Sequence, residues 1–143
     1  STGMSTKENI DNAVNIFKNH NCSFELMHCV STYPCEYSIA NIPKMLALKK
    51  IHPKIGYSDH IQGIESAKVA IGCGARVIEK HFTIDNELPG RDNKFAILPE
   101  DLFNLTQFIG IFSKMMIDHG EGYNILEVDS RMNYAGRFDK QVP

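Results

Sequence analysis

The sequence predicts an α/β fold in which parallel strands are joined by helices. Short apolar segments alternate with amphipathic ones, and no Ser/Pro-rich linker or low-complexity stretch divides the chain. The apolar segments begin near residues 23, 54 and 76, and such repetition is typical of strand–helix units with right-handed crossovers. A doubly wound sheet and part of an eight-stranded (β/α)8 barrel both fit. Because a complete barrel needs about 200 to 250 residues, this 143-residue chain supplies at most half of one.

Local patterns indicate the first helix and the first strand. Ser5 and Glu8 have the spacing of a capping box, and apolar residues then recur at helical spacing over residues 10–17. Residues 24–30 are mainly apolar, as expected of a strand buried on both faces of a parallel sheet. Residues 1–3 precede the helix as the end of an earlier strand would.

The next elements repeat this alternation. Asn41 is expected to cap a second helix that has Pro43 in its first turn. A second strand is expected over residues 54–57. A third helix follows from Ile64 and is stopped by Gly72.

The remaining sequence predicts one more strand and a long helix. Residues 76–82 form the expected third strand. Apolar residues recur at helical spacing from Leu102 to Met116, which predicts a final helix that ends at Gly120. We therefore expect one domain over residues 1–120 and a polar tail over residues 121–143.

Composition and charge argue against several classes of partner. Fifteen Lys plus Arg against seventeen Asp plus Glu leave a formal charge of −2, so nothing electrostatic favours nucleic acid or an anionic membrane. No apolar run approaches the roughly 20 residues of a membrane span, and residues 1–4 do not resemble a signal peptide. The four cysteines include no Cys-x-x-Cys pair. We expect a cytoplasmic protein with reduced thiols and with no nucleic-acid or membrane partner.

Polar side chains collect just after the predicted strands, where parallel α/β proteins place their active sites. Side chains alternate along a strand, which assigns His28 to the outward face. By the same alternation, three sets are expected on the inward face: Cys29, Ser31 and Tyr33; Gly56, Ser58 and His60; Val77, Glu79 and His81.

Two of these side chains suggest a metal site. His60 and His81 are 21 residues apart, so they are expected at matching heights on adjacent strands about 4.8 Å apart. Two imidazoles so placed can share a metal ion. The alternative is that each histidine caps a hydrogen-bond network or faces solvent.

Other polar groups near the strand ends have both functional and ordinary interpretations. Asp92 lies in a segment of turn-forming residues after the third strand, where it can hydrogen-bond a polyhydroxylated ligand or simply belong to a turn. The hydroxyls of Ser1, Ser31 and Ser58, together with backbone N–H groups at helix starts, can hold a phosphate. Routine helix capping is the alternative for each serine.

Four ordered motifs carry a resemblance to a known family. They are Ser1-Thr2-Gly3-Met4, His28-Cys29-Val30-Ser31-Thr32-Tyr33-Pro34, Ile55-Gly56-Tyr57-Ser58-Asp59-His60, and Val77-Ile78-Glu79-Lys80-His81-Phe82-Thr83 with Pro89-Gly90-Arg91-Asp92. In this order and spacing they resemble the sialic acid (N-acetylneuraminate) synthase family, which includes legionaminate and pseudaminate synthases. The resemblance runs from the first residue to about residue 120.

The resemblance implies the C-terminal half of a (β/α)8 TIM barrel and a transferase activity. Such an enzyme condenses phosphoenolpyruvate with the aldehyde of an N-acetylated amino sugar, N-acetylmannosamine or a related sugar, giving a nine-carbon 2-keto-3-deoxy acid and phosphate. A divalent metal, manganese or magnesium, would polarise the aldehyde. The resemblance also implies a homodimer of the full-length enzyme.

The resemblance further implies roles by motif position. His60 and His81 are the expected metal ligands and, with Glu79, the expected catalytic groups. Ser31 stands where better-known members carry Asn. The implied substrate contacts are Ser1, Ser31 and Ser58 for phosphoenolpyruvate, and Tyr33 and Asp92 for the sugar.

Two other hypotheses stay open. The chain can be a noncatalytic half-barrel that serves binding or assembly, or a different metal-dependent aldolase on a complete short α/β fold. A half-barrel has at most four strands, which leaves two open edges and an uncovered inner face. The residues that grip phosphoenolpyruvate would lie in the missing half. We therefore expect the isolated 143-residue fragment to be inactive as a synthase.

Overall fold

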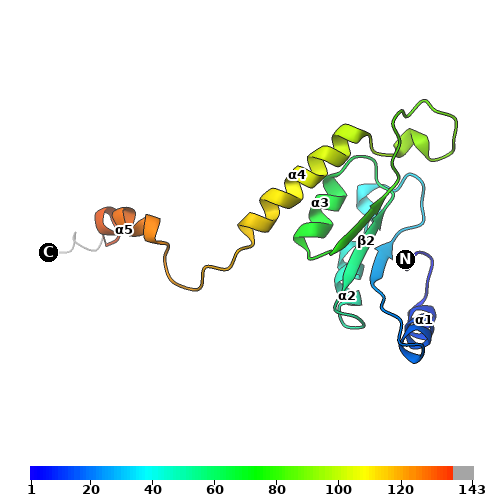
Figure 1. Cartoon of the computed structure of the whole chain (residues 1–143), viewed down its shortest axis with the longest axis horizontal. Coiled ribbons are helices and arrows are strands. Elements are labelled where there is room, and N and C mark those ends of the chain that lie inside the picture. Colours follow the sequence, from blue (N-terminus) through cyan, green and yellow to red (C-terminus); the bar gives the residue numbers. More distant parts are fainter. Residues whose placement is uncertain (137–143) are drawn as a thin grey trace. The chain divides into compact units, whose positions relative to one another are not determined.

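The computed structural model describes residues 1–136, and its first part is built around a parallel three-stranded sheet. The strands are β1 (Leu26–Cys29), β2 (Ile55–Asp59) and β3 (Val77–Lys80), and they lie side by side in chain order. Helices α2 (Ile42–Leu48) and α3 (Glu65–Gly72) pack against the sheet (Figure 1). The predicted α/β class with parallel strands is confirmed.

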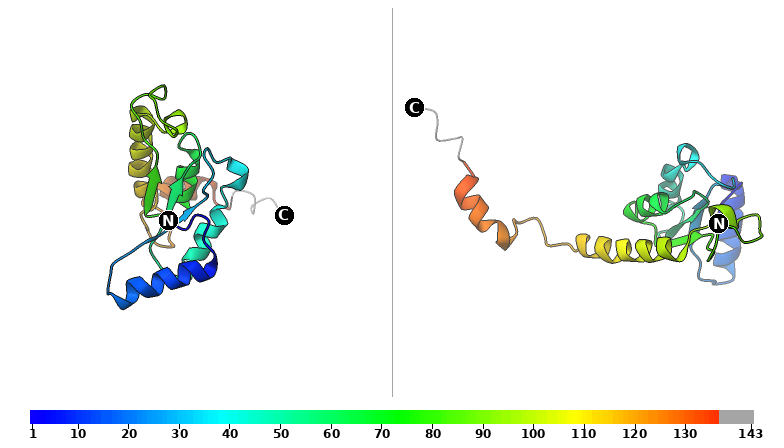
Figure 2. Two further views of the ribbon diagram at one scale, coloured as in Figure 1. Left: turned by 90° about the vertical axis from the view of Figure 1, so that its right-hand side faces the viewer. Right: turned by 90° about the horizontal axis from the view of Figure 1, so that it is seen from above.

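The other described residues form several further helices. Helix α1 (Lys7–Asn19) lies beside α2 (Figure 2), and α4 (Pro99–Met115) follows a long loop after β3. The shorter elements are the 3-10 helices η1 (Tyr37–Ile39), η2 (Asn93–Phe95) and η3 (Ile125–Glu127), and the helix α5 (Val128–Tyr134). Within residues 1–136, no helix combines the length and the apolarity that crossing a membrane requires.

The core lies on the helix-covered face of the sheet. Apolar side chains from all three strands meet α1, α2 and α3 there. The buried members are Ile10, Val14, Leu26, Met45, Leu48, Ile55, Tyr57 and Ala70, with Ile78 packed against them. A second cluster joins α3 to α4 through Ala67, Ile71 and Leu105. Burial of this apolar area is the main force holding the helices on the sheet.

The chain divides into two units within its last long helix. The first unit is Ser1–Phe112, and the second begins at Ser113, inside α4. The division into a domain over residues 1–120 and a tail over residues 121–143 stays a prediction. Helix α4 itself ends at Met115, five residues before the predicted stop at Gly120. The part of the predicted polar tail over residues 137–143 lies outside the described residues.

Several local expectations need correction. The first helix is capped by Thr6 and Asn9, which form a capping box, instead of by Ser5 and Glu8. Strands β1 and β3 are shorter than predicted, because only the residues that pair with β2 extend the ladder. Helix α5 was not predicted, although Asn124 and Glu127 just before it form a second capping box.

Gly56 provides a test of how closely the strands approach one another. Gly56→Ala is expected to lower the free energy of unfolding by about 1–3 kcal/mol, because an added Cβ would lie 2.7 Å from the Val77 carbonyl oxygen and 2.8 Å from Met27 Cγ. Chemical denaturation followed by circular dichroism measures the loss. Gly72→Ala is the matched control, since a Cβ there meets nothing within 4 Å. Equal losses in the two variants would contradict this explanation.

His28 makes stability depend on pH. It is buried on the helix-covered face, its Nε2 lies 2.8 Å from the Ala40 carbonyl oxygen, and burial lowers the pKa of its imidazole. The unfolded chain therefore binds the proton first as the pH falls below about 6.5, and stability decreases by up to about 1.4 kcal/mol per pH unit. In His28→Gln this part of the slope should disappear from pH-dependent denaturation curves. An unchanged slope would rule out His28 as its source.

Candidate active site

The β2–β3 register brings the two candidate histidines together. Ser58 pairs with Glu79 and Asp59 pairs with Lys80, so the next position along the chain places His60 opposite His81. The centroids of the two imidazole rings are 5.3 Å apart and their planes cross at 63°. The matching heights predicted from the sequence spacing are therefore confirmed.

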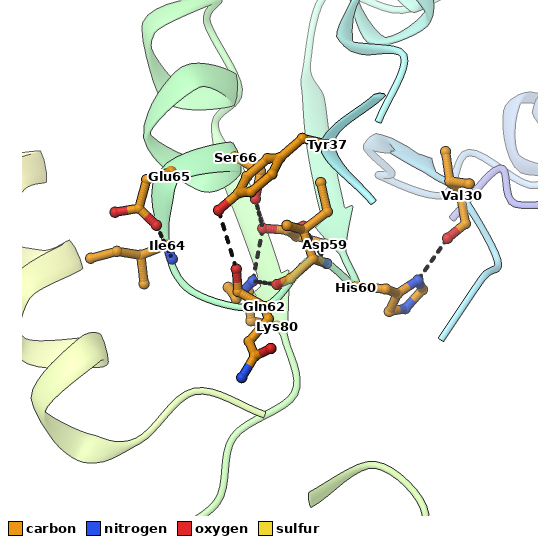
Figure 3. Close-up of polar contacts among 10 residues, drawn as sticks. Val30, Tyr37, Asp59, His60, Gln62, Ile64, Glu65, Ser66 and Lys80 are labelled. Atoms are coloured by element: carbon orange, nitrogen blue, oxygen red, sulfur yellow. Dashed lines mark hydrogen bonds and ion pairs between the residues drawn. The ribbon is translucent and has the colours of Figure 1, made fainter. Parts of the chain in front are cut away.

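The backbone after β1 orients the ring of His60. Its Nδ1 lies 2.8 Å from the Val30 carbonyl oxygen (Figure 3). Because a carbonyl oxygen only accepts, this contact places the proton on Nδ1 and leaves the lone pair of the neutral ring on Nε2. Ligating histidines are commonly held in this way, with one nitrogen donating to an oxygen and the other facing the metal.

An acceptor faces the same nitrogen of His81. Its Nδ1 lies 3.5 Å from Asp92 Oδ2, and the side chain is only partly exposed. Both rings therefore turn Nδ1 towards an oxygen, and Nε2 is the nitrogen that each can offer to a ligand. Asp92 is brought to the site as the sequence predicts, although here it contacts a histidine.

Two aromatic side chains form one side of the site. The ring of Tyr33 lies 4.1 Å from the ring of His60 and 6.0 Å from that of His81, measured between centroids. The ring of Phe95 lies 5.2 Å from His81. The motifs pointed to Tyr33 but not to Phe95, which reaches the site from the long loop after β3.

Ser58 and Glu79 form a pair two positions before the histidines. Ser58 Oγ donates to Glu79 Oε1 at 2.7 Å, across the β2–β3 boundary. Ser58 is buried while Glu79 is exposed. Alternation places both side chains on the same face as His60 and His81.

The first strand and the N-terminal segment border the site near His60. Cys29 Sγ lies 3.9 Å from His60 Nδ1 and 3.8 Å from Ser31 Oγ. The Thr2 N–H donates to the Met27 carbonyl at 2.8 Å, so the residues around Ser1 run beside β1. Ser31 is thus close to the histidine pair, while Ser1 is exposed at the start of this segment.

Two adjoining pockets open around these groups, and His81 lines both. The larger has a volume of about 860 Å³ and is lined by Tyr33, His81, Gly90, Arg91, Asp92, Lys94 and Phe95. The smaller, of about 290 Å³, is lined by Ser58, Asp59, His60, Glu79, Lys80 and His81. Arg91 and Lys94 add positive charge that was not expected from the sequence, because only the loop's path brings them here.

The donor set matches part of a metal site. Within residues 1–136, no group of three or more His, Cys, Asp or Glu side chains lies close enough together to hold a metal ion. His60 and His81 are a pair of candidate donors that lie side by side. Catalytic metal sites keep positions open for water or substrate, and imidazole pairs suit first-row transition metals. The residues fit such an ion as a partial site.

The sequence is similar to those of one known protein family. The model of the NeuB family matches residues 1–121. The N,N'-diacetyllegionaminic acid synthase of Campylobacter jejuni is 36% identical over 122 residues, which are 82% of this chain and 36% of that protein. The N-acetylneuraminate-9-phosphate synthase of Drosophila melanogaster is 34% identical over 115 residues, which are 78% of this chain and 31% of that protein.

A solved structure shares the fold. The crystal structure of N-acetylneuraminic acid (sialic acid) synthetase from Leptospira borgpetersenii, in complex with citrate, matches with a TM-score of 0.81 and 33% sequence identity. The match covers 97% of this chain and 49% of that one. The chain thus spans about a third of the length of the curated relatives named above, and about half of the crystallised synthetase.

Proposed function

The chain belongs to the NeuB family, and we propose that it forms the C-terminal half of a (β/α)8 barrel that condenses phosphoenolpyruvate with an N-acetylated amino sugar. Its named relatives are synthases of sialic-acid type sugar acids, which supports a sugar acid synthase. The observation that carries the proposal is the His60–His81 pair, held at the ends of adjacent strands beside two pockets. The product would be a nine-carbon 2-keto-3-deoxy acid plus phosphate.

In this proposal His60 and His81 hold a divalent metal, manganese or magnesium, through their Nε2 atoms. When bound, the ion would act as a Lewis acid on the sugar aldehyde. Neutral imidazoles leave the charge of the ion undiminished, which favours this role. The Val30 carbonyl and Asp92 keep the two rings turned so that Nε2 is presented.

The larger pocket suits the sugar. Tyr33 and Phe95 offer ring surfaces against which the apolar face of a sugar can pack, and Asp92 can accept hydrogen bonds from its hydroxyls. Arg91 and Lys94 can donate to the oxygens of an acyl group or a carboxylate. Aromatic rings beside charged groups are a common lining for polyhydroxylated ligands.

The smaller pocket suits phosphoenolpyruvate. Ser58 is the central hydroxyl, and its bond to Glu79 shows that it must exchange partners before it can donate to a substrate oxygen. Ser31 and Ser1 lie on the β1 side and would extend the contact. Glu79 would then lose the hydrogen bond from Ser58 and accept one from a sugar hydroxyl or water instead.

A noncatalytic assembly module is the second candidate. The outer edge of β3 in the described sheet favours it, because Val77 on this strand is 40% exposed and can pack against further strands. A different aldolase has no comparable support. The homodimer, the cytoplasmic location and the inactivity of the isolated fragment stay predictions.

Metal titration separates an enzyme from an assembly module. In the full-length protein, the double variant His60→Ala, His81→Ala should bind Mn²⁺ at least tenfold more weakly and lose synthase turnover, because both chelating nitrogens are removed. Electron paramagnetic resonance of free Mn²⁺ measures the affinity. His20→Ala removes the imidazole at the C-terminal cap of α1, outside the site, and serves as the control. Wild-type affinity and turnover in the double variant would exclude this assignment.

Kinetics of Asp92→Asn test the sugar site. The amide keeps the size of the side chain that faces His81 Nδ1, but it no longer offers charge-assisted acceptors to sugar hydroxyls. We expect kcat/KM for the sugar to fall roughly 10- to 100-fold, while the KM for phosphoenolpyruvate barely changes. Asp11→Asn on α1 is the control. An unaltered sugar KM and kcat would refute the role of Asp92.

A further inference from the structure

A buried ion pair lies directly behind the two histidines. Asp59 and Lys80 are the last residues of β2 and β3 and pair with each other in the ladder. Each immediately precedes one histidine in the chain, so alternation turns it to the opposite, helix-covered face of the sheet. Their side chains are 0% and 4% exposed.

The ammonium group of Lys80 holds the chain on both sides of His60. Lys80 Nζ donates to Asp59 Oδ2 at 2.8 Å and to the Ile61 carbonyl oxygen at 2.6 Å (Figure 3). Asp59 and Ile61 are the two neighbours of His60 in the sequence. One side chain of β3 therefore restrains the backbone that carries His60, while the next residue of β3 is His81 itself.

Both oxygens of the Asp59 carboxylate accept hydrogen bonds. Asp59 Oδ1 accepts from the Ile61 N–H at 3.0 Å, and Oδ2 accepts from Ser66 Oγ at 2.6 Å. Ser66 lies in the first turn of α3, so the pair also ties this helix to the ends of both strands. These bonds explain how two charges remain buried at this position.

Stability alone does not account for such a pair. A buried ion pair is often no more stabilising than well-packed apolar residues of similar volume, because both charges lose their hydration. Its bonds are directional, however, and they are satisfied in one arrangement of the two strands. A shift of one residue moves a strand by about 3.3 Å, which would leave each charge unpaired and separate the two imidazoles.

We propose that Asp59 and Lys80 are a positioning pair that sets the separation of the His60 and His81 imidazoles. Their role in metal binding rests on the proposed function, whereas their effect on the distance between the rings does not. Alternation turns both side chains away from the face that carries the two imidazoles. The pair restricts the two imidazole rings to one relative position.

The test measures chelation by the two histidines in the full-length protein. Cu²⁺ is the main probe, because it binds imidazole pairs more tightly than other divalent first-row ions. Its affinity depends on the separation of the two rings, whatever metal the protein uses. Mn²⁺ is titrated in parallel. We expect His60→Ala to abolish Cu²⁺ binding at this site, and Lys80→Met to weaken it about tenfold at a temperature where the variant is fully folded.

A double variant separates positioning from stability. Lys80→Met leaves Asp59 as a buried, unpaired charge, so it should also lower the melting temperature. Adding Asp59→Asn removes that charge, keeps an acceptor for the Ile61 N–H and offers an amide NH2 that can donate to Ser66 Oγ, and should restore much of the melting temperature. We expect the weak Cu²⁺ affinity to persist. Lys68→Met, which breaks the exposed Lys68–Glu65 pair on α3, should change neither affinity nor chelate geometry.

Each outcome decides the proposal. Wild-type Cu²⁺ affinity in Lys80→Met, or recovery of affinity together with stability in the double variant, would overturn it. Cu²⁺ binding that is independent of His60 and His81 would overturn it too, because the rings would not form a chelate. If the wild type binds Cu²⁺ through both histidines but does not bind Mn²⁺, the proposed metal chemistry fails. The Cu²⁺ affinities of the wild type and Lys80→Met then still test the role of Asp59 and Lys80.

Discussion

The register between β2 and β3 is the constraint on which the rest of the site depends. It pairs Ser58 with Glu79 and continues to His60 and His81. Because side chains alternate with a period of two, a slip of one residue would turn the whole polar set towards the helices. The close approach at Gly56, where no side chain fits, allows the strands to meet at this spacing.

Strand β2 serves stability and chemistry with the same five residues. All of them are buried. Ile55 and Tyr57 face the helices and belong to the core, and burial raises the pKa of the Tyr57 phenol, which keeps it neutral. Gly56 and Ser58 face the other way. The two roles are therefore coupled, since a change that repacks the core also moves the residues that carry the polar groups.

Periodicity explains what could be predicted from the sequence. Crossover spacing and alternation are local properties, so the strand order and the heights of His60 and His81 follow from them. The loop after β3 has no such period. Its path depends on side-chain bonds such as those from Asn86 Nδ2 to the Asn93 and Ala96 carbonyls, at 2.6 and 3.0 Å. Consequently Phe95 was missed, as were Arg91 and Lys94.

The Asp59–Lys80 pair was accessible to the same reasoning. Each residue precedes a candidate ligand, and alternation alone assigns both to the helix-covered face, where an unpaired charge is costly. That one is an acid and the other a base on neighbouring strands is a readable signal for an ion pair. What alternation cannot give is the second bond of Lys80, to Ile61, because this depends on how the chain turns after β2.

The proposed metal site, with His60 and His81 as its ligands from this region, would depend strongly on that framework. Four protein ligands would fix the position of an ion through several distances. His60 and His81 would fix it through one distance, the separation of their two rings. A change in that separation would therefore act directly on metal binding. In the proposed enzyme the remaining positions would belong to water, substrate or residues outside this chain, so the strand ends of β2 and β3 are the part of the geometry that this sequence controls.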